Sequence, residues 1–218
     1  MTEPHRSRGT SAGLTREAIV AAAERVIDRS GFEGTSLRSV AVELGVTPGA
    51  MYNHFPSKQD LLDAVADEFL AREVLRRLPR AAAPLDRVRL VCRRLHAAGV
   101  AHPQLLLSVI GHIPERIDSA QLRVADVLLT DLRAAGADGP QLPVLYRALV
   151  TLSAGNAVYD SHLASAPPAE AKRRLAHQLA SSPYPAFVDY LQSWPPGKAP
   201  DWFEAQLDLV LSGLEQKS

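Results

Sequence analysis

The sequence predicts an all-α protein, on three observations. Apolar side chains recur at the i, i+3, i+4 spacing of amphipathic helices along most of the 218 residues. Residues that begin helices, such as Ser and Thr, and residues that end them, such as Gly and Pro, stand at the boundaries of these segments. No stretch shows the period-2 alternation of a half-buried strand.

The first two helices have clear boundaries. Thr15 is placed to cap the first, and apolar residues follow at helical spacing until Gly31, a typical C-terminal residue, ends it. A second, shorter helix is predicted over 36–44, and Gly45 closes it.

The third helix is unusually short. It is predicted over 47–54, because Pro48 suits its first turn and Pro56 disfavours helical geometry in the residue before it. A fourth helix begins at Ser57, whose spacing to an acidic residue matches a capping box, and is expected to continue to about Leu78.

Helical periodicity continues through the rest of the chain. Further helices are predicted over 84–100, 103–113, 116–136, 142–164 and 201–216, with short ones around 169–181 and 185–194. The last two fall in a proline-rich insertion, residues 165–200, which holds seven of the sixteen prolines.

Composition excludes several classes of protein. The only cysteine is Cys92, which excludes an intramolecular disulfide framework and a multi-cysteine metal site. The N-terminal residues lack the apolar core of a signal peptide, and the longest apolar stretch, 105–113, is too short to span a bilayer. We therefore expect a soluble, cytoplasmic protein without a metal or cofactor.

The segments 36–44 and 47–54 have the signature of a helix-turn-helix, in which two short helices flank a tight turn with Gly. The first helix of such a unit crosses the DNA backbone, and the second lies in the major groove. The small residues Gly49 and Ala50 would let the second helix approach DNA closely, while the Thr47 hydroxyl would reach a phosphate or a base edge.

The end of this helix carries polar tips suited to phosphate oxygens, on Tyr52, Asn53 and His54, and Lys58 follows on the same side. The alternative is that Tyr52 packs in the core and that His54 only satisfies a local carbonyl. For Phe55 we expect the core.

Three motifs within residues 14–69 carry a family resemblance: G-F-x-G-T-S-L, A-x-E-L-G-V and G-A-x-Y-x-H-F-x-S-K-x-x-L-L. In combination they resemble the DNA-binding domain of the tetracycline-repressor (TetR) family of transcriptional regulators. The resemblance implies a repressor that binds a palindromic operator as a homodimer and is released by a small molecule bound in its C-terminal domain. It places the DNA-facing positions on Ser36, Arg38, Thr47, Pro48, Gly49, Ala50, Tyr52, Asn53, His54 and Lys58.

Two departures from the family pattern bear on recognition. Ser39 stands where many relatives carry a basic residue, and 48–50 offers few donors for base edges. We therefore expect sparse direct readout, with more left to DNA shape and to Arg6 and Arg8 of the N-terminal arm.

The predicted organisation is a flexible basic arm (1–13), a helix-turn-helix domain (14–60) and, beyond a linking helix, a helical ligand-binding and dimerisation domain (61–218). The segment 142–164 is a candidate dimer helix, because its small residues allow a close approach. The segment 201–216 is apolar over a wide arc, as in a helix buried on two sides. Paired with their symmetry mates, the two would form a four-helix bundle.

A mostly apolar ligand pocket is expected among the helices between 84 and 164. Its polar candidates are Cys92, His96, His112, Tyr146, Asn156, Tyr159 and His162. Each has an alternative role in packing or in solvent. Gly111 and Pro114 weaken a helix beside an apolar wall, so that segment could shift when a hydrophobic effector fills the cavity. The insertion 165–200 would cover the pocket or, as we favour, extend the dimer interface.

Two other classes of function compete. The sequence lacks G-x-S-x-G, a Walker loop and H-E-x-x-H, so we expect no enzyme, although a helical enzyme using the C-terminal half is a less favoured alternative. An architectural DNA-binding dimer without an effector is the other. It would have a solidly packed C-terminal body.

Overall fold

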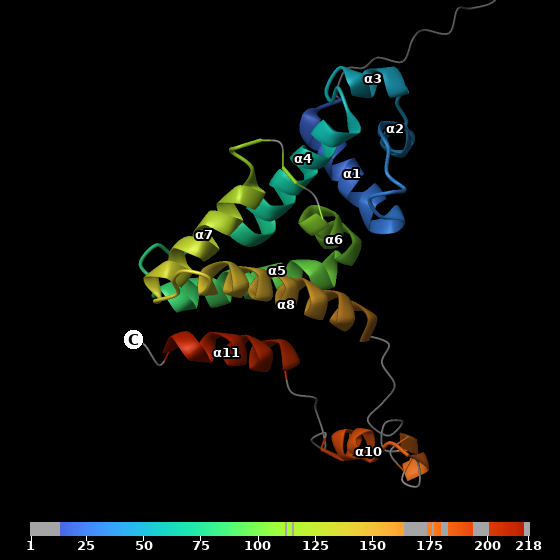
Figure 1. The fold of residues 1–218 in the computed structure, drawn as a ribbon. Helices are drawn as coiled ribbons and strands as arrows, with labels where there is room; N and C mark the ends of the chain where they lie inside the picture. The colour runs from blue at the N-terminus through green and yellow to red at the C-terminus, as the bar shows by residue number, and fades with distance from the viewer. Residues whose placement is uncertain are drawn as a thin grey trace, which may run out of the picture. The chain divides into compact units, whose positions relative to one another are not determined.

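The computed structural model describes residues 14–111, 113–114, 116–163, 174–175, 177–179, 183–193 and 201–215. Every regular element in these ranges is a helix, which confirms the all-α fold class (Figure 1). The chain divides into two compact units: the first comprises Met1–Leu78 and His102–Val127, and the second Pro79–Ala101 and Leu128–Ser218. The domain boundaries 1–13, 14–60 and 61–218 stay a prediction.

The first unit is a bundle of short helices around α1. Its elements are α1 (Arg16–Ser30), α2 (Leu37–Leu44), α3 (Pro48–Tyr52), α4 (Lys58–Leu70), the π-helical turn η1 (Ala71–Leu75), α6 (Pro103–Gly111) and the first part of α7 (Ala120–Ala134). Helix α1 packs against α2, α4 and α6, and α2 packs against α3. Large side chains without solvent exposure form the core, among them Ile19, Ile27, Met51, Phe55, Leu61 and Phe69.

Side chains at the predicted helix starts make the expected bonds. The Thr15 hydroxyl accepts from the Ala18 N–H at 3.1 Å. Ser36 and Ser39 form a reciprocal capping box, in which each hydroxyl accepts the other residue's backbone N–H, at 3.0 and 2.8 Å. Ser39, noted from sequence as a missing basic residue, therefore fixes the start of α2.

Two differences from the predicted helix boundaries have a clear cause. Helix α3 ends at Tyr52, two residues early, because the Met51 carbonyl accepts from the N–H groups of both His54 and Phe55, which tightens the last turn. The helical run that was expected to reach about Leu78 ends at Leu75, and its last five residues are not α-helical, since α4 ends at Leu70 and continues as the wider π-helical turn η1.

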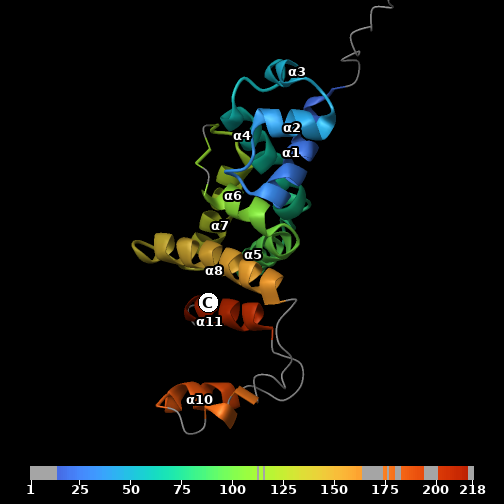
Figure 2. The same ribbon diagram turned by 90° about the vertical axis from the view of Figure 1, so that its right-hand side faces the viewer.

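The second unit is built on α5 (Pro84–Ala101), α8 (Gln141–Leu163) and α11 (Trp202–Glu215), with α10 (Pro185–Gln192) and the end of α7. Helix α8 packs on both α5 and α11, and Figure 2 shows α5, α8 and α11 together again from a second direction. Arg93 of α5 donates to both oxygens of Glu204 of α11, at 2.6 and 2.7 Å. Buried side chains between these helices include Val91, Leu95, Leu149, Leu207 and Leu211.

Of the two short helices predicted in the proline-rich insertion, the structure describes one. The helix expected around 185–194 is present as α10, whereas the one around 169–181 lies largely outside the described residues, as do Arg6, Arg8 and His112. Across the described part of the chain, no helix combines the length and the apolar character needed to cross a membrane.

Candidate DNA-binding site

The turn between α2 and α3 is fixed by backbone hydrogen bonds. Gly45 adopts the left-handed conformation, at φ 65°, which favours glycine because it has no Cβ. The Val46 N–H reaches the Ala41 carbonyl at 3.0 Å, and the Gly45 N–H reaches the Val42 carbonyl at 3.1 Å. These two bonds form a Schellman motif, which sets the direction in which α3 leaves α2.

Two buried side chains anchor α3 to the core. Met51 and Phe55 are both 0% exposed, so the expectation that Phe55 packs in the core is confirmed. Because these residues face inward, the rest of this short helix is turned toward solvent.

The outward face of α3 holds most of the predicted DNA contacts. Thr47, Pro48, Gly49, Tyr52 and Asn53 are exposed, and the Tyr52 side chain is 58% accessible. Thr47 occupies the N-cap position, but its hydroxyl makes no capping bond. A continuous strip of small residues followed by polar tips therefore lies open.

The other predicted positions flank this strip. Ala50 and His54 are half-buried, and Arg38 is exposed on the first turn of α2. The Lys58 ammonium donates to the Phe32 carbonyl at 3.0 Å and lies 4.5 Å from the centre of the Phe32 ring. Lys58 is thus engaged within the domain, and a phosphate contact would have to compete with this bond.

Arg16 supports the site from behind. Its Nη1 donates to the His54 carbonyl at 3.0 Å, and its guanidinium lies 4.1 Å from the centre of the Phe55 ring. Sequence reasoning missed this role, because the two partners are 38 residues apart and a first-turn arginine gives no sign of such a contact.

An ion-pair cluster holds α2 against α1. Glu43 accepts from Arg25 Nε at 3.0 Å and from Arg29 Nη2 at 2.5 Å. The hydrogen bonds from Arg29 and Arg25 hold the pKa of the Glu43 carboxyl below its ordinary value. Glu43 therefore stays ionised and links the two helices.

The second unit brings three of the predicted ligand-binding residues to one face of α8. The thiol of buried Cys92 contacts the Ser153 side chain of α8. Burial raises the pKa of this thiol to about 12. His96 Nε2 lies 2.9 Å from Asp160 Oδ2, and Asn156 donates to Gln206 Oε1 at 2.9 Å.

These polar groups are largely satisfied by one another. The His96 ring also stacks on Phe203 of α11, with centres 4.1 Å apart. The seam where α5, α8 and α11 meet, defined by Cys92, His96 and Asn156, therefore combines buried apolar side chains with polar groups that are paired internally, as Arg93 also is with Glu204.

The other candidates for ligand binding lie apart from this seam. Tyr146 is half-buried, and burial raises the pKa of its hydroxyl. Tyr159 and His162 are exposed. Among the residues described, no group of three or more His, Cys, Asp or Glu side chains is placed to hold a metal ion.

A short exposed helix, fixed by a glycine turn and anchored on a helical core, gives α2 and α3 of the first unit the form of a helix-turn-helix. The family model "Bacterial regulatory proteins, tetR family" matches residues 19–65. The curated repressor DrrR1 of Streptomyces coeruleorubidus is 43% identical over 61 residues, which are 28% of this chain and 23% of that protein. This match thus spans about a quarter of the relative's length.

Solved structures extend the likeness to the whole fold. The transcriptional regulator SCO7222, a TetR from Streptomyces coelicolor, has a TM-score of 0.70 at 27% identity, over 94% of this chain and 99% of that one. ActR of the same organism, solved in complex with actinorhodin, has a TM-score of 0.70 at 24% identity, over 94% and 98%. Residues 19–65 thus match the tetR family model, and the chain as a whole shares its fold with TetR regulators of known structure.

Proposed function

We propose that the protein is a ligand-responsive transcriptional repressor that binds a palindromic operator as a homodimer in the cytoplasm. The observation that carries this proposal is the exposed face of α3, which buried Met51 and Phe55 hold outward. The match of residues 19–65 to the tetR family model supports it, as does the likeness of this domain to that of a curated repressor.

The exposed apolar side chains of α8 and α11 support the homodimer. Leu209 of α11 is 75% exposed and Val144 of α8 is 66% exposed, whereas Phe203 and Leu207 of α11 are buried. Helix α11 is thus apolar on two sides, as predicted for a helix that faces its own core and a partner. A second copy would cover the outer side through a four-helix bundle.

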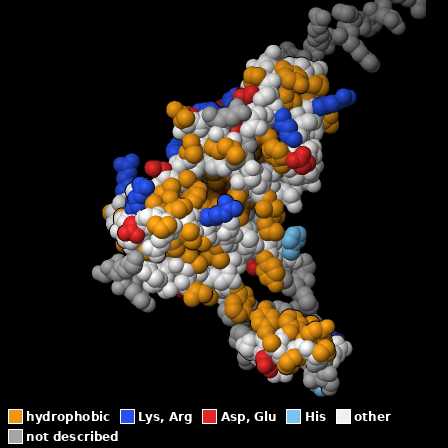
Figure 3. All heavy atoms as spheres, in the orientation of Figure 1, with side chains coloured by type: hydrophobic (Ala, Val, Ile, Leu, Met, Phe, Trp, Pro, Cys, Tyr) orange, Lys and Arg blue, Asp and Glu red, His pale blue; other side chains and the backbone are white. Residues whose placement is uncertain are grey.

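Apolar side chains also gather on α10 (Figure 3). Tyr184, Phe187 and Tyr190 are exposed, and the last two rings stack with centres 5.9 Å apart. We extend the proposed dimer interface to this helix, in line with the role expected for the insertion.

The proposed effector is a hydrophobic small molecule held by the second unit. Polar side chains at its helix seam are already paired, so an effector there would rely on apolar contacts. A fold neighbour that was solved with actinorhodin supports this class. The effector releases DNA only to the extent that it prefers the conformation that does not bind the operator.

The test is in-vitro selection of fragments from the source genome, with the parent protein and an Ala50→Arg, Tyr52→Ala variant. We expect the parent to enrich a short inverted repeat that the variant loses. A variant with Arg133→Gln, at an exposed position of α7 outside the helix-turn-helix, is the matched control and should select the same repeat. Enrichment that survives in the double variant would contradict the role of α3.

A further inference from the structure

We propose that a groove in the first unit binds a compact zwitterionic small molecule, at a site separate from the effector seam. The groove has a volume of about 390 Å³, within the range of small-molecule sites. It is lined by Arg16, Glu17, Val20, Ala21 and Glu24 of α1, by Ala64, Asp67, Glu68, Ala71 and Arg72 from α4 and η1, and by Arg116 and Arg123.

The hollow follows from where small side chains occur. Ala21 of α1 faces Ala64 and Ala71 across the groove, where larger residues would close the gap between these helices. The third wall of the groove is the segment that carries Arg116 and Arg123. The Asp67 carboxylate holds it in place, because Asp67 Oδ1 accepts from the N–H of Ala120, the first residue of α7, at 2.6 Å. The groove is thus bounded by elements that are bonded to one another.

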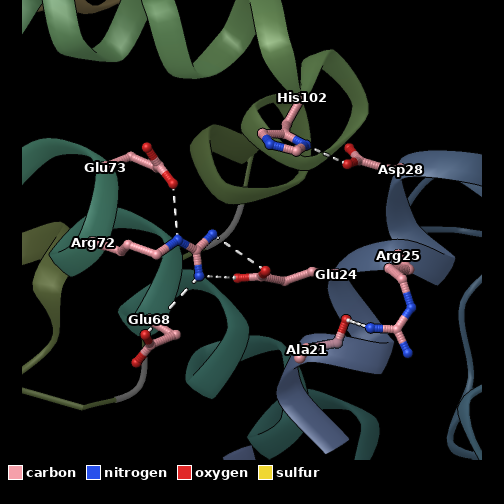
Figure 4. A network of polar contacts seen from close by, with 8 residues as sticks. All are labelled: Ala21, Glu24, Arg25, Asp28, Glu68, Arg72, Glu73 and His102. Carbon is pink, nitrogen blue, oxygen red and sulfur yellow. Dashed lines mark hydrogen bonds and ion pairs between the residues drawn. The ribbon is translucent and has the colours of Figure 1, made fainter. Parts of the chain in front are cut away.

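Part of the groove is lined by Arg72, whose guanidinium is paired with the carboxylates of Glu24, Glu68 and Glu73. The Arg72 guanidinium donates to both oxygens of Glu24, at 3.1 and 3.2 Å, and to Glu73 at 2.8 Å (Figure 4). Because these side chains bond one another, the kind of ligand that the groove prefers depends mainly on its other charged residues.

The remaining charges differ between the walls. Glu17 and Asp67 lie on α1 and α4, where Arg16 is the other charged residue, whereas Arg116 and Arg123 lie on the third wall. Arg116 already donates to both oxygens of Asp118, at 3.0 and 2.6 Å, so Arg123 is the cation best placed for a ligand. A simple anion would meet the carboxylates, and a simple cation would meet the two arginines. A molecule with an ammonium group toward α1 and α4 and a carboxylate toward the arginines satisfies both sets.

The groove also reaches the support of the DNA-binding face. Arg16 lines it and donates to the His54 carbonyl just beyond α3. A ligand ammonium group beside Glu17 would repel the neighbouring Arg16 guanidinium, which would loosen the end of α3 and weaken operator binding. This consequence rests on the proposed function, whereas the binding site itself does not.

The experiment is calorimetric titration of the full chain, without DNA, with glycine, 4-aminobutyrate and 6-aminohexanoate. Hexylamine and hexanoate serve as probes that carry one charge each. We expect saturable binding of at least one amino acid, and binding weaker by about tenfold for each single-charge probe. Failure of all three amino acids to bind overturns the site, and equal binding of hexylamine or hexanoate overturns the zwitterion.

Two variants locate the site. Ala21→Leu fills the groove and Arg123→Gln removes one cation, and both change exposed residues, so we expect an unaltered fold and an affinity about tenfold lower. Arg133→Gln is the matched control for the loss of one arginine and should bind as the parent does. Equal binding by all three variants would place the ligand elsewhere and overturn the proposal.

Operator binding, measured separately, distinguishes the two proposals. Saturable amino-acid binding in a chain that selects no operator would remove the proposed function and leave the groove. Operator selection by a chain that binds no amino acid would support the proposed function and overturn the groove as a binding site.

Discussion

Met51 and Tyr52 are neighbours on α3, and their replacement by alanine should have opposite consequences. Met51 is 0% exposed and Tyr52 is 58% exposed. Removing a fully buried methionine side chain lowers the free energy of unfolding by about 2–5 kcal/mol, because the cavity left behind adds to the lost burial. The change at Tyr52 removes little buried surface and should lower it by less than about 1 kcal/mol.

Thermal unfolding followed by circular dichroism measures the first effect. In a chain of this size, each kcal/mol shifts the melting temperature by about 2–4 °C, so a loss of about 3 kcal/mol in Met51→Ala lowers it by about 6–12 °C. Tyr52→Ala should stay within about 4 °C of the parent. Thr130→Ala, at an exposed position of α7, controls for an alanine introduced into a helix.

Operator affinity measures the second effect. If the Tyr52 hydroxyl bonds a phosphate, its removal in Tyr52→Phe costs about 1–1.5 kcal/mol for each head. A dimer with two heads then loses about 2–3 kcal/mol, or about 30- to 150-fold in Kd. Because phosphate contacts carry no sequence information, binding to random DNA should weaken in parallel. An unchanged Kd in both Tyr52 variants, or a melting temperature as low in Tyr52→Ala as in Met51→Ala, would refute this assignment of the two faces.

Three further predictions concern stability. Gly45→Ala should lower the free energy of unfolding by about 1–2 kcal/mol through backbone strain, since a Cβ there meets no atom within 4 Å; an unchanged urea midpoint would argue against it. Burial raises the pKa of the Cys92 thiol to about 12, so the folded state keeps a proton that the unfolded thiol releases above about pH 8.5. The free energy of unfolding therefore keeps this contribution below that pH and falls by up to about 1.4 kcal/mol per pH unit above it. Urea unfolding of Cys92→Ala, measured against pH, should show a shallower decline. Arg87 Nε lies 3.2 Å from an oxygen of buried Asp131, so Arg87→Met should lower the free energy of unfolding by about 3–5 kcal/mol at neutral pH. The double variant Arg87→Met, Asp131→Leu should recover most of this loss, and no recovery would show that the arginine acts through packing.

The start and end of several helices could be predicted because the deciding interactions are local. Thr15, Ser36 and Gly45 act on backbone groups within a few residues of themselves, so the chain near each one is enough to indicate its role. Phe55 was expected in the core because it is a large apolar side chain among polar neighbours, and it is buried. The likeness of the helix-turn-helix to a known family added the expected DNA-facing positions.

Contacts between distant segments were not predictable in this way. Arg16 behind α3, the pair of Glu24 with Arg72, and the Asp67 carboxylate at the start of α7 join residues that lie tens of positions apart. A charged residue on a helix face gives the same local pattern whether it meets solvent or a partner. Whether such a residue meets solvent or a partner depends on how helices that are distant in sequence pack against one another.

The sequence by itself determined the class of fold, the short helix with its small front and polar back, and the turn that presents it, because helical periodicity and capping are properties of neighbouring residues. The tertiary structure alone decided that Lys58 turns to Phe32, that Cys92, His96 and Asn156 meet along α8, and that a charged groove opens between α1 and α4. Those features depend on which helix faces meet, and that is settled by burial across the whole unit.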